Sequence, residues 1–322
     1  MISTKAKVFA DTRDMSREEW LEKRRQGIGG SDVSALLGLN PYSSPMKIYL
    51  DKIGKLEEQE TNEAMRQGTD LEDYVASRFC EDTGKKVKRV NRILQHPEFP
   101  WMLANIDRDI VGEDAGLECK TCSPYSKFKF DEGEINPHYY WQAMHYMAVT
   151  GAPRWYVAIL VLGKEYVTFC VERDEAAVQT LVDVEKNFWR NHVVAKVPPL
   201  PTGSESDGEA IDSIYPKGEI EDQVMPLDDM ADRLNLRGML MEQRDKLDAQ
   251  INEIDQTIKL AMGTFERASS GMWKIRWTNS STSRVDTKLL RAKYPQIAEE
   301  VTKTSTGRRY TVTKMKEEEN NV

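Results

Sequence analysis

Two acidic residues and a lysine lie among short apolar runs, at a spacing that allows chemistry. Glu118 and Lys120 alternate within "GLECKT", and Asp107 lies in the preceding "NIDRD". Side chains two residues apart in a strand share a face, and a neighbouring strand would bring Asp107 beside them. Two carboxylates and the Cys119 carbonyl are the oxygen ligands that Mg²⁺ and Mn²⁺ prefer. We therefore expect metal-assisted hydrolysis, in which Lys120 orients water or neutralises charge in the transition state.

A further carboxylate is expected to reach this place from a helix. The stretch "NEAMRQGTDLEDYVASRFCEDTG" has apolar residues at helical spacing and closes on Gly84. Glu72 lies on this helix and could complete the ligand set, with Asp70 and Asp73 as its competitors. The plain alternative for the Glu-x-Lys pair is a surface ion pair on an edge strand, which contributes little to stability.

Two other segments carry polar groups at suggestive spacing. Gln142 and Tyr146 are four residues apart on one face of the predicted helix "NPHYYWQAMHYMAVTG", which marks either a polar seam of the core or support for a site. Upstream, Arg25 precedes the glycine-rich "GIGGSD", and Ser31 or Asp32 is placed to cap the helix that follows. A guanidinium and exposed backbone N–H groups could bind a phosphate; the alternative is a tight turn beside a solvated arginine.

The order of elements predicts an α/β protein with an appendage. Helical patterns come first, then three strand-like runs, a helix, a hairpin around residues 163–165 and a closing helix. Residues 1–195 would form this domain, and residues 196–224 have the composition of a linker. Residues 225–322 contain an apolar heptad seam, a sign of a coiled coil or helical hairpin, and then a small basic strand–helix–strand cap. The seam residues are Leu240, Leu247, Ile254 and Ala261, with Ile251 and Ile258 between them and Arg244 at one seam position.

Composition limits the possible roles. The net charge of −8 argues against a protein that coats nucleic acid, although residues 271–316 carry eleven Lys and Arg against three Asp and Glu. No apolar run reaches membrane-spanning length, and the first residues lack the apolar core of a secretory signal. We expect a cytoplasmic protein.

Together these motifs resemble the PD-(D/E)XK nuclease superfamily, and residues 16–194 resemble the YqaJ-type viral recombinase family, relatives of phage lambda exonuclease. The similarity lies in "RRQGIGGSDVSALLGLNPYSSPMKIYLDKIG", "GTDLED", "ANIDRDIVGEDAGLECKT" and "YYWQAMHYM". The first of these motifs is specific to YqaJ-like proteins, whereas the acidic core is shared widely. The resemblance implies a central mixed β-sheet flanked by helices.

The resemblance also implies roles for individual residues. Those expected at the metal are Glu72, Asp107, Glu118 and the Cys119 carbonyl, with Lys120 as the catalytic lysine and Gln142 in support. Tyr146 would support the nearby DNA strand, and the terminal-phosphate pocket would use Arg25 and Ser31. Ile106 and Arg108 flank the core aspartate, where the family often has proline and glycine.

The expected function is therefore a Mg²⁺-dependent DNA exonuclease, with Mn²⁺ as the alternative ion. By resemblance it would resect linear duplex ends 5′ to 3′ in the bacterial host of a phage or prophage. The implied partners are DNA ends, a single-strand annealing protein and further copies of the chain in a ring such as a trimer. Two alternatives are an endonuclease on the same core and a non-catalytic DNA-end-binding adaptor of a recombination complex.

Overall fold

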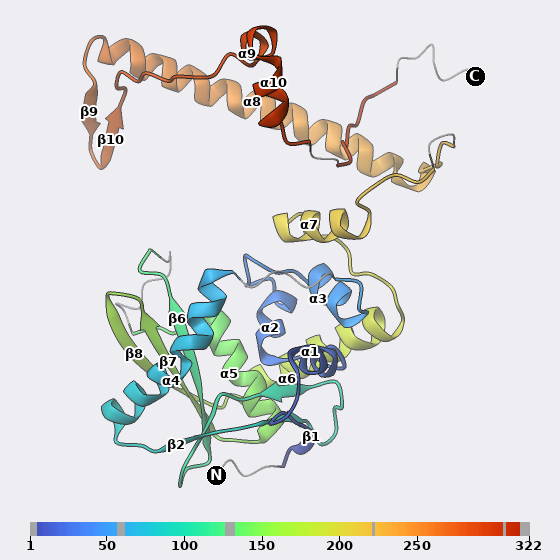
Figure 1. Cartoon of the computed structure of the whole chain (residues 1–322), viewed down its shortest axis with the longest axis vertical. Coiled ribbons are helices and arrows are strands. Elements are labelled where there is room, and N and C mark those ends of the chain that lie inside the picture. The colour runs from blue at the N-terminus through green and yellow to red at the C-terminus, as the bar shows by residue number, and fades with distance from the viewer. Residues whose placement is uncertain (1–4, 57–61, 126–132, 221–222, 305–306, 316–322) are drawn as a thin grey trace. The chain divides into compact units, whose positions relative to one another are not determined.

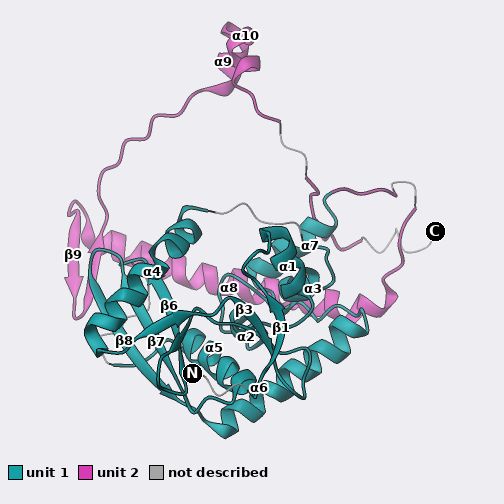
Figure 2. Ribbon diagram, turned by 60° about the horizontal axis from the view of Figure 1, so that its bottom comes forward, with its two compact units in different colours: residues 1–216 teal, residues 217–322 magenta. Residues whose placement is uncertain are grey.

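The computed structural model describes residues 5–56, 62–125, 133–220, 223–304 and 307–315. The chain forms two compact units, residues 1–216 and 217–322 (Figure 2). All the residues singled out for chemistry belong to the first unit. In the described part of the chain, no helix combines the length and the apolar composition needed to cross a membrane.

The first unit is built on a mixed sheet with strand order β2-β5-β6-β7-β8 (Figure 1). Only β6 and β7 run parallel, and the other neighbouring pairs are antiparallel. A smaller antiparallel sheet has the order β1-β3-β4. The strands are β1 Lys7–Asp11, β2 Val87–Arg89, β3 Arg92–Gln95, β4 Leu103–Asn105, β5 Arg108–Ile110, β6 Ala115–Cys122, β7 Arg154–Val161 and β8 Glu165–Glu172.

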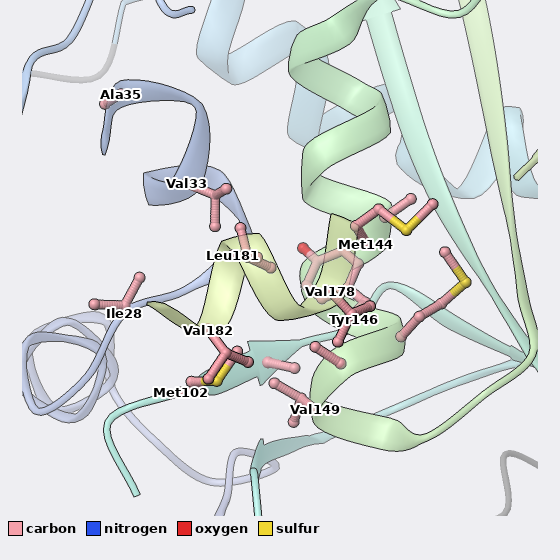
Figure 3. Packing of buried hydrophobic residues seen from close by; sticks show 14 of the residues in the cluster. Ile28, Val33, Ala35, Met102, Met144, Tyr146, Val149, Val178, Leu181 and Val182 are labelled. Atoms are coloured by element: carbon pink, nitrogen blue, oxygen red, sulfur yellow. The ribbon is translucent and has the colours of Figure 1, made fainter. Parts of the chain in front are cut away.

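Helices cover both faces of the large sheet, because β7 is apolar on both sides. Trp155, Val157 and Ile159 belong to the core cluster shared with α2, α5 and α6, whereas Tyr156 and Ala158 join the cluster formed with α4. Figure 3 shows the α2–α5–α6 side of this packing. The helices of the unit are α1 Arg17–Arg25, α2 Gly30–Leu36, α3 Pro45–Lys52, α4 Glu63–Thr83, α5 Pro137–Thr150, α6 Glu175–Phe188, the π-helix η1 Trp189–Val194 and α7 Glu205–Ile214.

The predicted α/β class, a central mixed sheet flanked by helices, is confirmed. The helix ends follow from local chemistry: α4 begins where the Asn62 side chain accepts from the Met65 N–H, and it stops at Gly84, whose φ is 69°. The start of α2 differs from the expected one. Gly29 is its N-cap, and Asp32 lies inside the helix, where its carboxylate accepts from the Gly29 N–H at 2.9 Å.

The segment predicted to be a linker, residues 196–224, contains the helix α7. Ser204 caps it by accepting from the Asp207 N–H, Ala210 is buried, and α7 packs against α3. The first compact unit therefore extends to Pro216. The proline- and glycine-rich composition that favours a linker belongs to the residues around α7, while one face of α7 itself is apolar enough to pack.

The second unit begins with the short helix η2 Asp228–Met230 and the long helix α8 Ala231–Met262, which contains the predicted heptads. A hairpin follows, in which β10 Trp273–Arg276 pairs with β9 Arg267–Ser270, and then come α9 Thr287–Lys293 and α10 Pro295–Glu300. The second strand expected in the basic cap, over "RRYTVTK" at residues 308–314, is absent, and among the described residues this segment pairs with no strand.

Candidate active site

The candidate site lies on the α5 face of β6. Leu117 and Cys119 pack toward α4 on one side of the strand, so Glu118 and Lys120 project on the other. The backbone of β6 approaches Trp155 so closely that a Cβ on Gly116 would lie 2.2 Å from the indole ring. The absence of a side chain at Gly116 therefore leaves room for the indole against the strand that carries the charged pair.

A chain of hydrogen bonds runs from Lys120 into the protein. The Lys120 Nζ lies 2.7 Å from Glu118 Oε1, and Gln142 Nε2 donates to the same oxygen at 2.6 Å and to Tyr146 Oη at 2.8 Å. Glu118 and Gln142 are buried, whereas the Lys120 side chain is 24% exposed. Direct contacts therefore join β6 to α5 at this place, with Lys120 at the solvent edge.

Asp107 lies just before β5 and faces the same place. Its Oδ2 accepts from the Cys119 N–H at 2.8 Å, so the backbone of β6 holds the carboxylate. Burial, and then the charge of Glu118, raise the pKa of Asp107 well above its usual range, although Lys120 opposes this shift. Burial acts to lower the pKa of Lys120, but Glu118 and Asp107 raise it overall, so the amine is held as a cation. Two carboxylates therefore face one ammonium.

Glu72 reaches the edge of this site from α4, but an arginine binds it. Arg108 Nη1 donates to Glu72 Oε1 at 2.5 Å, and Arg108 Nη2 donates to Asp73 at 2.7 Å. Glu72 is still close enough to contribute to the raised pKa of Asp107. Arg108 occupies the position at which the family often has glycine. Its contacts with Glu72 and Asp73 of α4 were not predicted from the sequence.

Several features bear on whether the site fits a metal ion. Within the described ranges, His, Cys, Asp and Glu side chains do not gather in groups of three or more that could hold an ion. Glu118 Oε2 and Gln142 Oε1 are nevertheless buried without a hydrogen-bond partner among the described residues. Buried carboxylate oxygens in folded proteins are normally satisfied by a protein group, water or an ion. The two neighbouring carboxylates fit a cation, since burial and the charge of Glu118 raise the pKa of Asp107. Glu72 could join them only by leaving Arg108.

Beside Ser31, where a phosphate pocket was expected, the structure places a different arginine from the predicted one. Arg25 lies 3.3 Å from Asp51 of α3, whereas Arg24 Nη2 donates to Ser31 Oγ at 2.8 Å and stacks on Trp20 with its guanidinium 4.7 Å from the ring centre. The Gly29 N–H is occupied by Asp32. Arg24 is therefore the arginine that accompanies Ser31, which sequence reasoning missed because the two arginines are adjacent in "RRQG".

Tyr146 is buried within the protein, not exposed to DNA as its predicted role implied. Its ring lies 5.1 Å from that of Trp155, and a Cβ on Gly30 would lie 2.8 Å from it. Burial, and then the charges of Glu118 and Asp107, raise the pKa of Tyr146 well above its usual range. Tyr146 therefore stays neutral and fixes the Gln142 amide that contacts Glu118.

A buried pair of ionisable side chains next to Tyr146 was not predicted from the sequence. His145 of α5 contacts Glu185 of α6 through Nδ1 and Oε1 at 2.7 Å, and its Nε2 lies 2.8 Å from the Leu103 carbonyl. Burial opposes the charge on the imidazole, but Glu185 raises the pKa of His145 overall. The pair ties α5, α6 and β4 together, and the ring centre of His145 lies 6.1 Å from that of Tyr146.

Comparison with known proteins identifies the family. Residues 19–153 match the model of the YqaJ-like viral recombinase domain. The chain is 37% identical to the YqaJ protein of Bacillus subtilis strain 168 over 313 residues, which cover 96% of this chain and 98% of that protein. The chain belongs to the YqaJ-like viral recombinase family. A shorter similarity, 31% over 85 residues, links it to protein D345L of African swine fever virus and covers 26% of this chain and 25% of that protein.

Solved structures with similar folds were also found. An alkaline exonuclease from Laribacter hongkongensis is 22% identical, with a TM-score of 0.48, and the match covers 56% of this chain and 94% of that chain. A phage-related exonuclease from Haemophilus somnus 129PT is 13% identical, with a TM-score of 0.39 over 53% of this chain and 96% of that chain.

Proposed function

We propose that this protein is a metal-dependent DNA exonuclease that resects linear duplex ends from the 5′ side, leaving 3′ single strands for recombination by strand annealing. The observation that carries the proposal is the convergence of Asp107, Glu118 and Lys120 on one face of β6, with the ammonium 2.7 Å from Glu118. Membership of the YqaJ-like viral recombinase family supports the link to recombination.

Asp107 and Glu118 would hold the ion, with the Cys119 carbonyl as a further ligand and Glu72 as the carboxylate that joins from α4. Mg²⁺ is the proposed ion, with Mn²⁺ as the alternative, because all these groups offer hard oxygen atoms. When bound, the ion supplies Lewis-acid polarisation of the phosphate and a more acidic water.

The protein groups have separate tasks around the scissile phosphate. Lys120, held as a cation by two carboxylates, stabilises the negative charge that builds up as water attacks, and it is the group at the solvent edge of the site. Gln142 keeps Glu118 in one orientation, and Tyr146 keeps the Gln142 amide in place. As the water oxygen bonds to phosphorus, the bond from phosphorus to the 3′ oxygen of the terminal nucleotide breaks. That nucleotide leaves with a 3′ hydroxyl, and the shortened strand keeps the phosphate as its new 5′ end.

End recognition is assigned to the region of Arg24 and Ser31. Gly30 contacts both Tyr146 and Gln142, so the adjacent Ser31 and its partner Arg24 lie beside the acidic centre. A guanidinium and a hydroxyl together can bind a terminal phosphate. Arg25 is engaged by Asp51 and is the weaker candidate.

The wider setting is proposed from the family. The protein would act on DNA ends in the cytoplasm of a bacterial host, pass its 3′ strand to an annealing protein and work as a homo-oligomer, for which a trimeric ring around DNA is the arrangement we favour. The location, the annealing partner and the oligomer are additional proposals, and the proposed hydrolysis at Lys120 does not require them.

The test is digestion of a linear duplex that carries a 5′ phosphate and a different fluorophore on each strand. With Mg²⁺ we expect mononucleotides from the 5′-phosphorylated strand, while the complementary strand stays intact. With a chelator we expect no products. Nicking of closed circular DNA at a comparable rate would instead indicate an endonuclease.

A further inference from the structure

The long helix α8 leaves a stripe of apolar side chains exposed. It contains 32 residues, a length of about 48 Å at 1.5 Å per residue. Among the described elements, only the short helix η2 that leads into it packs against α8 beyond isolated contacts. Isolated apolar side chains are common on protein surfaces, but a continuous stripe of them marks a surface that is covered in the working molecule. Its large exposed apolar residues are Leu234, Leu236, Met239, Leu240, Leu247, Ile251, Ile254 and Leu260.

The stripe has the period of a two-stranded coiled coil. Leu240, Leu247 and Ile254 recur every seven residues, and Ile251 fills the intermediate position. Leu247, Ile251 and Ile254 are each more than half exposed, so the seam lies open along the helix. A seam of this kind is buried by another helix of similar length.

The charges on the seam are distributed unevenly along the helix. Arg237 and Arg244 occupy seam positions in the N-terminal half, whereas Asp248 and Asp255 flank the seam in the C-terminal half. In a parallel, in-register pair each arginine would face its own copy, which is repulsive. In an antiparallel pair, the seam arginines of one helix lie along the flanking aspartates of the other.

The register that aligns these charges also places one apolar pair, Leu240 and Ile251, in the seam. Setting Leu240 of one copy opposite Ile251 of the other brings Arg244 beside Asp248 and Arg237 beside Asp255, and the two helices overlap along almost their whole length. Leu247 and Ile254 then lie against the aliphatic stems of Arg244 and Arg237. The charges along the seam are therefore complementary to those of a second copy about a twofold axis.

We propose that α8 is a pairing surface for a second copy of this chain, and that the two helices form an antiparallel two-stranded coiled coil. The pairing needs only the second unit and does not depend on the proposed nuclease activity. It joins chains two at a time, in addition to any association made by the first unit.

The test uses charge reversal in the full-length protein, with sedimentation as the readout. Arg237→Glu and Asp255→Arg should each weaken the pairing at least about tenfold, because each places like charges side by side at both ends of the coiled coil. The double variant should restore the association. Arg237 and Asp255 are 18 positions apart in one helix, so the rescue has to occur between copies. Glu242→Lys, on the side of α8 opposite the seam, is the matched control and should have no effect.

Orientation is tested by a double cysteine variant, Leu240→Cys with Ile251→Cys. These positions are about 16 Å apart within one helix, so a disulfide between them joins two copies. After mild oxidation, peptide mapping should identify the link between positions 240 and 251. A link between two copies of position 240, or single charge reversals that leave sedimentation unchanged, would overturn the proposal. So would a double reversal that fails to restore pairing while circular dichroism shows the helix intact.

Discussion

Replacing Gly30 with alanine should lower the nuclease activity, although Gly30 itself lies outside the candidate active site. Gly30 begins α2 and lies against α5, so a Cβ there would be 2.8 Å from the Tyr146 ring and 3.1 Å from Gln142 Cγ. Carbon atoms prefer separations of about 3.5–4.0 Å, so the ring would have to move by about 0.7–1.2 Å. Trp155 lies on the ring at 5.1 Å between centres, which leaves little room for that movement.

The size of the effect follows from these contacts. Forcing an extra carbon into a packed core costs about 1–3 kcal/mol, which lowers the stability without unfolding a domain of this size. A shift of about 1 Å in Tyr146 would break its 2.8 Å hydrogen bond with Gln142, and with it the positioning of Glu118. Misplacement on this scale can reduce a rate about 100-fold. We therefore expect Gly30→Ala to lose far more activity than stability.

The matched control is Gly68→Ala, the same substitution at another helical glycine. The nearest atom to a Cβ there is Thr121 Oγ1 at 3.6 Å, an ordinary contact. Alanine is favoured over glycine inside a helix by about 0.5–1 kcal/mol, so Gly68→Ala should be neutral or stabilising and should retain its activity. Urea unfolding and nuclease rates would be measured on both variants. If Gly30→Ala kept full activity, the proposed Gly30–Tyr146–Gln142 support of Glu118 would be refuted.

Two other predictions concern groups beside the site. Arg24→Ala should abolish the preference for 5′-phosphorylated over 5′-hydroxyl ends, while Arg25→Ala should largely keep it. Competition between the two substrates measures this preference. The reverse result would show that Arg25, and not Arg24, binds the terminal phosphate. Glu185→Ala should cost about 1–3 kcal/mol of unfolding free energy, because it leaves the buried Nδ1 of His145 without a partner. Glu185→Gln keeps a partner and should cost less than about 1 kcal/mol by urea unfolding; equal costs for both variants would contradict this role.

The sequence was sufficient for features that depend on local periodicity. Glu118 and Lys120 share a face because strand side chains alternate, and Asp107 meets them because β5 and β6 are neighbours in an antiparallel pair. The helix α4 could be predicted from its apolar spacing and from Gly84, which adopts the left-handed conformation that ends a helix.

Features that depend on distant partners could not be predicted in this way. Adjacent residues on a helix point about 100° apart, so which of two neighbouring arginines meets Ser31 depends on where Asp51 of α3 lies. The choice of Arg108 as the partner of Glu72 likewise joins residues 36 positions apart. The strand β9 was missed because "RASS" has no alternating apolar pattern, and it forms by pairing with β10.

The most direct test of the central claim compares two lysine variants on 5′-phosphorylated linear duplex with Mg²⁺. Lys120 and Lys164 each lie 2.7 Å from a glutamate, but Lys164 is in the exposed turn between β7 and β8. Lys120→Ala should lower the rate of nucleotide release about 10²–10³-fold while Lys164→Ala matches the wild type. A Lys120→Ala protein as active as the Lys164→Ala control, or a wild type that leaves the duplex intact with both Mg²⁺ and Mn²⁺, would contradict the account.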